Sequence, residues 1–85
     1  MASYRTSSNS LASFLKYFGY GFKLNSYEDG KVYFLFDENE KGFHDTVMDF
    51  KDAVNDRRSV YIDYARLLHI QEDIREMIKI YKENK

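Results

Sequence analysis

The two histidines are the side chains of this sequence that ordinarily exchange a proton near neutral pH. His44 is followed directly by Asp45, with Asp49 one helical turn further on, and a histidine–carboxylate pair can act as a general base or supply half of a metal site. The sequence has no cysteine, no H-x-x-x-H spacing, no Gly-x-Ser-x-Gly motif and no glycine-rich phosphate loop. We therefore expect no enzyme and no metal or other cofactor, and we interpret His44 and His69 as surface histidines.

A row of carboxylates is the sharpest feature of the middle of the chain. Four aspartates follow one another at spacings of four, three and four residues. At about 100° per residue, this spacing places them on one face of a helix, opposite its apolar edge. Their repulsion costs a few tenths of a kcal/mol per pair, so a solvated face can carry it, but a rigid row of charge can also dock a basic partner. The candidate partner-binding residues are Asp45, Asp49, Asp52 and Asp56.

A second candidate surface combines aromatic and basic side chains around a strand predicted over residues 31–36. Aromatic rings on a strand can stack on nucleobases, while lysine and arginine hold phosphates. The strand lacks the glycines of the RNA-recognition signature, and a hydrophobic core strand explains its apolar residues equally well. The candidate residues for this nucleic-acid alternative are Tyr20, Lys23, Lys31, Tyr33, Arg57 and Arg58.

The 85 residues fit one small domain, and their composition, 44% hydrophobic and 32% charged, is that of a globular chain. The net charge of −1 argues against a strongly basic nucleic-acid binder. The charge is uneven, however, because residues 28–56 carry nine acids against three bases. The polar start predicts no secretory signal, and no apolar run is long enough to span a bilayer. We expect a cytoplasmic protein without a membrane partner, as a monomer or homodimer.

The elements that must position these residues can be placed from the apolar pattern. Residues 1–7 predict a flexible arm ahead of a single domain over residues 8–85. Apolar residues at helical spacing, after Ser8 and before Gly19, predict a helix over residues 9–18. Two strands, over residues 21–25 and 31–36, flank Asp29-Gly30, which is a strong hairpin signal.

The second half of the chain predicts two further helices. One covers residues 43–54, and a long one covers residues 64–82 with Asp63 as its N-cap. Residues 59–62 are a candidate for a short third strand. The fold class is therefore α+β, a small antiparallel sheet packed with three helices in the order helix, hairpin, helix, optional strand, helix.

The predicted core is the set of apolar residues that these elements turn toward one another. Tyr33 and Leu35 point to the opposite face of their strand, which is either covered by another element or used for binding. The predicted core residues are Leu11, Phe14, Leu15, Phe18, Phe22, Leu24, Val32, Phe34, Phe36, Val47, Phe50, Val54, Leu67, Ile70, Ile74 and Met77.

An ordered pattern runs from Leu11 to Tyr81: an apolar helix, Gly21-Phe22-x-Leu24, a hairpin ending Phe34-x-Phe36, an acidic helix, a Val60-to-Asp63 segment and a long last helix. In this order it resembles a family of short uncharacterised proteins from phages and bacterial mobile elements. The resemblance implies no activity and no catalytic residue. It implies a setting in which small proteins often act as accessory or host-directed binders. We therefore expect a non-catalytic inhibitor-like binder of a host or phage protein complex, acting through the acidic face, with nucleic-acid binding as the alternative.

Overall fold

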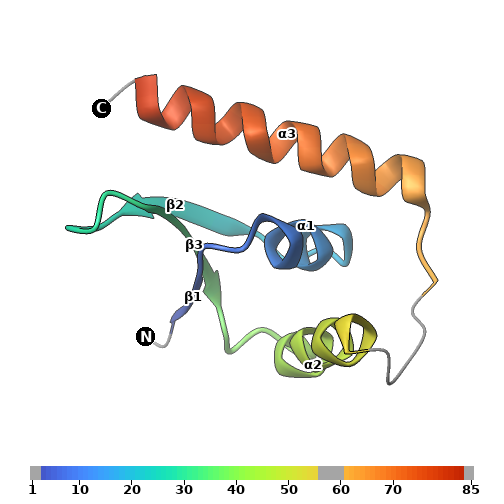
Figure 1. Cartoon of the computed structure of the whole chain (residues 1–85). Helices are drawn as coiled ribbons and strands as arrows, with labels where there is room; N and C mark the ends of the chain where they lie inside the picture. Colours follow the sequence, from blue (N-terminus) through green and yellow to red (C-terminus); the bar gives the residue numbers. More distant parts are fainter. Residues whose placement is uncertain (1–2, 56–60, 84–85) are drawn as a thin grey trace.

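Six elements follow one another in the computed structural model, which describes residues 3–55 and 61–83 (Figure 1). The α+β class is confirmed, and so is the predicted succession of helix, hairpin, helix and helix. The bounds of the three predicted helices and of the hairpin strands differ from the predictions by one residue or less at each end. The elements are β1 (Ser3–Thr6), α1 (Asn9–Tyr17), β2 (Phe22–Ser26), β3 (Val32–Asp37), α2 (Phe43–Val54) and α3 (Tyr64–Glu83).

The start of the chain differs from the prediction, because Ser3–Thr6 form a strand where a flexible arm was expected. This strand pairs antiparallel with β3, with Tyr4 opposite Phe36 and Arg5 opposite Leu35. The ring of Tyr4 packs edge-on against Phe43, with ring centroids 5.4 Å apart. A strand this short forms because it pairs with β3 and because its Tyr4 packs on the buried ring of Phe43. Both partners are distant in the sequence.

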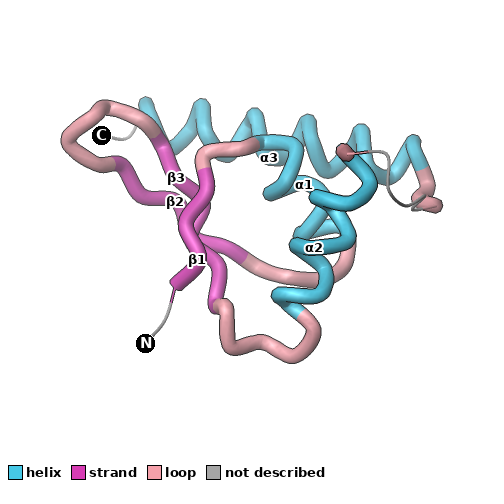
Figure 2. The backbone as a smooth tube through the Cα atoms, turned by 60° about the horizontal axis from the view of Figure 1, so that its bottom comes forward, coloured by secondary structure: helices cyan, strands magenta, loops and turns pink. Residues whose placement is uncertain are grey.

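The third strand of the sheet therefore comes from the start of the chain. Tyr61 and Ile62 lie in no strand, and the rest of the predicted segment at 59–62 lies outside the described residues. The strand order is β1-β3-β2, with both outer strands antiparallel to β3. Since β1 and β2 thus run parallel to each other, the chain needs a crossover between them, and α1 provides it (Figure 2).

The hairpin has the predicted turn, and its register puts the predicted core residues of both strands on one face. Gly30 has a φ of 78°, which favours glycine, and its N–H donates to the Tyr27 carbonyl over 2.9 Å. Phe22 pairs with Phe36 and Leu24 with Phe34, so the predicted apolar residues share one face of the sheet.

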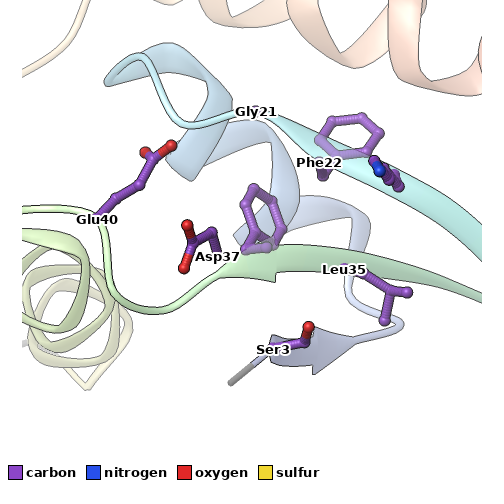
Figure 3. A pocket seen from close by; sticks show the side chains of 8 residues that line it. Ser3, Gly21, Phe22, Leu35, Asp37 and Glu40 are labelled. Carbon is purple, nitrogen blue, oxygen red and sulfur yellow. The ribbon is translucent and has the colours of Figure 1, made fainter. Parts of the chain in front are cut away.

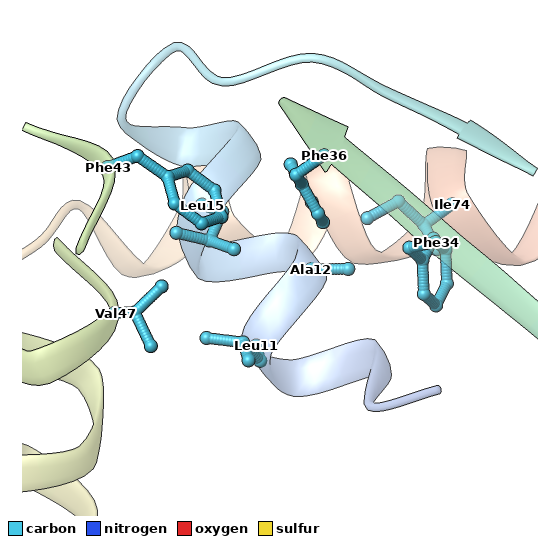
Figure 4. Close-up of a cluster of buried hydrophobic side chains, with 8 residues drawn as sticks. All are labelled: Leu11, Ala12, Leu15, Phe34, Phe36, Phe43, Val47 and Ile74. Carbon is cyan, nitrogen blue, oxygen red and sulfur yellow. The ribbon is translucent and has the colours of Figure 1, made fainter. Parts of the chain in front are cut away.

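Helix α1 is the most buried helix, because it lies among the sheet, α2 and α3 (Figures 1 and 4). Its start and end are as predicted: the Ser8 hydroxyl accepts the Leu11 N–H at 3.1 Å, and Gly19 follows with a φ of 97°. Residues 11–15 are all buried, including Ser13, whose hydroxyl donates to the Asn9 carbonyl at 2.7 Å. That bond satisfies the polar group of a serine that has no contact with water.

The core joins α1, α2 and α3 to one face of the sheet (Figure 4). Two predicted core residues are wrong: Phe18 is 45% exposed and Val54 is 67% exposed. Both stand at the end of a helix, Phe18 as the cap of α1 and Val54 as the last residue of α2, beyond the elements that would cover them. The cluster of buried apolar residues consists of Leu11, Ala12, Leu15, Phe34, Phe36, Phe43, Val47 and Ile74.

Tyr20 holds the connection between β3 and α2. Its hydroxyl donates to the Lys41 carbonyl at 2.8 Å, and its ring packs edge-on against Phe43 at 5.4 Å. Gly42 caps α2 with a φ of 77°, and a β-carbon added there would lie 3.0 Å from the Tyr20 hydroxyl. The start of α2 therefore has room for glycine and little more.

Replacing Phe34 or Ile74 by alanine should each lower the free energy of unfolding by about 2–5 kcal/mol, because both are fully buried and truncation leaves a cavity. Urea unfolding followed by circular dichroism measures the loss. Val54→Ala is the control, and its cost should be about 0.5 kcal/mol or less because the side chain is largely exposed. Midpoints near that of the wild type for both core variants would contradict this core.

Gly42→Ala should destabilise the protein more than Gly30→Ala. Both glycines have nearly the same positive φ, so the backbone strain of about 1–2 kcal/mol is common to both variants. Only at position 42 does the new methyl group also meet the Tyr20 hydroxyl, since nothing lies within 4 Å of a β-carbon at position 30. Thermal unfolding of the two variants gives the difference, and equal losses would mean that Tyr20 moves aside without cost.

Candidate functional site

The aspartate row on α2 is only partly open to solvent. Asp45 is exposed in the first turn of the helix, whereas Asp49 and Asp52 are half-buried. Asp56 lies outside the described residues. The row thus presents less exposed charge than a fully solvated helix face would.

The histidines lie apart from each other and on the surface. His44 is exposed beside the ring of Phe43, at 5.7 Å between centroids, and His69 is exposed on α3. Within residues 3–55 and 61–83, no three acidic or histidine side chains come close enough to hold a metal ion. None of the helices in this part of the chain combines the length and the apolar character needed to cross a bilayer.

The nucleic-acid candidates separate into three groups. Tyr20 is engaged with Lys41 and Phe43 at the start of α2. Arg57 and Arg58 lie outside the described residues. The remaining three, Lys23, Lys31 and Tyr33, belong to the hairpin, where Lys23 pairs with Leu35.

All three described helices pack on the core side of the sheet, so within residues 3–55 and 61–83 no helix covers its opposite face. The described core takes Phe34 and Phe36 from β3, and because side chains alternate along a strand, Tyr33 and Leu35 point away from it. We call this side the open face. Leu35 occupies its middle, with Arg5 opposite on β1 and Lys23 opposite on β2. Both flanking residues are exposed, so a half-buried leucine lies between two solvated cations.

Two tyrosines hold the side chain of Arg5 in place on the open face. Its guanidinium carbon lies 4.7 Å from the ring centre of Tyr27 and 4.9 Å from that of Tyr33. The two rings meet edge-to-face, with centroids 5.2 Å apart. Such cation–π contacts favour a flat, stacked guanidinium while the residue stays exposed.

The Tyr33 hydroxyl extends this arrangement to the hairpin turn by donating to a carboxylate oxygen of Asp29 at 2.7 Å. The other Asp29 oxygen accepts the Lys31 N–H at 3.0 Å. The bond from Tyr33, followed by the bond from Lys31, lowers the pKa of Asp29, and the same bond to Asp29 raises the pKa of Tyr33. At neutral pH the pair is therefore an ionised carboxylate and a neutral phenol.

At its other end the open face runs into a hollow of about 450 Å³ (Figure 3). Leu35 and Ser3 lie on one side of it, and Asp37 and Glu40 lie on the other. Lys23 also lines it, so this hollow carries charges of both signs.

Two residues of the open face were missed by the sequence analysis, Arg5 and Tyr27. Arg5 fell in the predicted arm, although the alternation Tyr4-Arg5-Thr6 is compatible with a strand that has one face half-buried. Tyr27 follows β2 directly, and nothing in its neighbours indicates that it would meet Tyr33.

A protein-family model with the description Domain of unknown function (DUF5659) matches residues 1–80, nearly the whole chain. The chain belongs to this family. The expected likeness to an uncharacterised family is thus confirmed, while the phage or mobile-element origin stays a prediction. No curated protein and no solved structure matches the chain. The family carries no assigned function, so a function has to be argued from the open face itself.

The Asp29–Tyr33 bond predicts two coupled shifts in titration. Carbon-detected NMR should place the Asp29 midpoint below 3.8, and Tyr33→Phe should raise it toward that value. Asp29→Asn should in turn lower the raised Tyr33 pKa toward 10.0. The bond stabilises the hairpin above the ordinary pKa of Asp and is lost as the pH falls through the lowered pKa. At the alkaline end it is lost as the pH rises through the raised pKa of Tyr33.

Tyr27→Phe is the matched control for this titration, because it removes a neighbouring hydroxyl but leaves the Tyr33–Asp29 bond in place. The Asp29 midpoint should stay low in that variant. A midpoint that Tyr33→Phe leaves unchanged would show that the bond does not form in solution.

Proposed function

We propose that the open face binds single-stranded nucleic acid. The observation that carries the proposal is the exposed Arg5 guanidinium, held against the rings of Tyr27 and Tyr33 beside Leu35. Bases of single strands stack on aromatic rings and on guanidinium planes, and the sheet modules that bind them present such groups on an uncovered face. The function is therefore that of a non-catalytic binding module.

Each part of the open face has a role in this proposal. The Arg5 guanidinium lies against both tyrosine rings and is exposed, so it offers an incoming base a cationic plane that the two rings hold in place. Leu35 offers the next base an apolar surface. Lys23, opposite Leu35 on β2, is placed to bind a phosphate, and Lys31 lies at the start of β3 on the same hairpin.

A single strand suits this surface better than a duplex does. The bases of a duplex are already stacked on one another and cannot lie on Arg5 or Leu35. A duplex would therefore bind through phosphate contacts alone, and the described residues of the face and its hairpin offer three cations for them, on a chain with a net charge of −1.

The competing proposal is a protein binder that docks a basic partner on the aspartate row of α2, such as an inhibitor of a host or phage complex. It is supported by the regular spacing of the row on one helix and by the exposed Asp45. Two of its charges, Asp49 and Asp52, are half-buried, and a docking row loses strength when its charges are withdrawn from the surface. We therefore favour the open face.

Fluorescence anisotropy with labelled single-stranded DNA and RNA of about twelve nucleotides tests the proposal, since sheet modules commonly bind strands of about that length. Three cations on phosphates predict a salt slope near −2, which is roughly a 20-fold loss of affinity between about 50 and 200 mM salt. Duplex DNA of equal length should bind more weakly. Absence of binding at low salt would reject the proposal and leave the aspartate row as the remaining candidate.

Arg5→Ala should weaken binding about tenfold and reduce the salt slope by about 0.7, because it removes both a stacking surface and a cation. Arg75→Ala is the matched control: it removes the same side chain from an exposed position on α3, the helix that packs on the other face of the sheet. An equal loss in both variants would mean that overall charge, not the open face, governs binding. Thermal unfolding shows whether either variant has lost its fold.

A further inference from the structure

A second hollow of about 450 Å³ lies where three segments of the fold meet. These are the connector between β1 and α1, the hairpin turn, and the last turns of α3. Ser7 lines it from the connector, Asn9 from the start of α1, Lys31 from the position directly before β3, and Lys82 from α3. We call it the lysine hollow.

The charge of its lining distinguishes the lysine hollow from the hollow beside Leu35. Among the described residues, its charged lining consists of two lysines, without a carboxylate. The hollow beside Leu35 instead has Lys23 together with Asp37 and Glu40. A concave surface lined by positive side chains, without a carboxylate among them, raises the local concentration of anions.

We infer that the lysine hollow binds a phosphate group. Two exposed lysines reach it from different elements, and each carries an ammonium group with three hydrogen-bond donors on a flexible stem. The Ser7 hydroxyl and the Asn9 amide are neutral groups that can donate to the remaining phosphate oxygens. The nearby Asp29 carboxylate accepts bonds from Tyr33 and from the Lys31 backbone, and its charge also interacts with Lys31, so a phosphate in the hollow competes with Asp29 for that lysine.

The place of the lysine hollow indicates where that phosphate comes from, and this step rests on the proposed function. Ser7 stands two residues after Arg5, and Lys31 stands two residues before Tyr33. Val32 and Ile78 also line the hollow, so it lies at the hairpin end of the sheet on the side of α3, while Arg5 and Tyr33 meet on the opposite, open face. A strand that leaves this stack over the end of the hairpin reaches the hollow next. The phosphate is therefore one of the backbone of the bound strand.

NMR titration of the ¹⁵N-labelled protein with inorganic phosphate, at constant ionic strength against chloride, tests the hollow itself. The amides of Ser7, Asn9 and Gly30 should shift and saturate, and Lys82→Gln should abolish these shifts. Lys79→Gln is the matched control, because Lys79 is also an exposed lysine of α3 but does not line the hollow. Shifts that are absent, or that are equal in the two variants, would overturn the inference.

The oligonucleotide assay then separates the two sources of phosphate. If the strand's own phosphate occupies the hollow, Lys82→Gln should weaken binding of the single strand about threefold to fivefold and reduce the salt slope by about 0.7, while Lys79→Gln should not. Saturable inorganic phosphate binding with an unchanged oligonucleotide affinity would overturn the assignment to the strand and support a free phosphate. Phosphate binding without any oligonucleotide binding would support the hollow and reject the proposed function. Oligonucleotide binding that does not depend on Lys82, together with an absence of phosphate shifts, would support the proposed function and reject the phosphate site in the hollow.

Discussion

The pairing of β3 on both of its edges is the constraint on which the rest of the structure depends. A central strand has a neighbour on each side, and its side chains must divide between two faces. In β3 the division places Phe34 and Phe36 in the core and leaves Tyr33 and Leu35 on the open face. The core and the candidate site are thus the two faces of one six-residue strand.

The same constraint makes the register of the hairpin decisive. A slip of one residue would exchange the two faces of β3, placing Tyr33 in the core and Phe34 in solvent. The turn at Asp29-Gly30 opposes such a slip, because Gly30 adopts a positive φ and Asp29 accepts bonds from Lys31 and Tyr33. Asp29 therefore connects the turn, which sets the register, to the stack that we propose as the binding platform.

The open face gathers residues that are far apart in the chain. Arg5 meets Tyr27 and Tyr33 because β1 lies against β3, while the side chain of the neighbouring Tyr4 packs on Phe43 at the start of α2. The short β1 strand therefore has two functions. Its Tyr4 covers one edge of the core, and its Arg5 places a cation on the open face.

The predictions from sequence succeeded where the signal is local. The three helices and the hairpin follow from apolar spacing and from Ser8, Gly19 and Gly30, each of which acts within a few residues of its own position. On the open face, Lys23, Lys31 and Tyr33 were identified because a strand alternates. The place of Tyr20 does not follow from such a pattern, since its bond to Lys41 joins segments that only the folded chain brings together.

By itself, then, the sequence determined the three helices and the hairpin, their order and the sidedness of the hairpin, because propensity, capping and alternation are properties of neighbouring residues. The tertiary structure decided that Ser3–Thr6 is a strand, that Phe18 and Val54 are exposed, and that Arg5 lies on two tyrosines. The physical reason is the same in each case. A short edge strand, a helix end and a cation–π contact depend on which distant surface is within reach, and no local pattern contains that information.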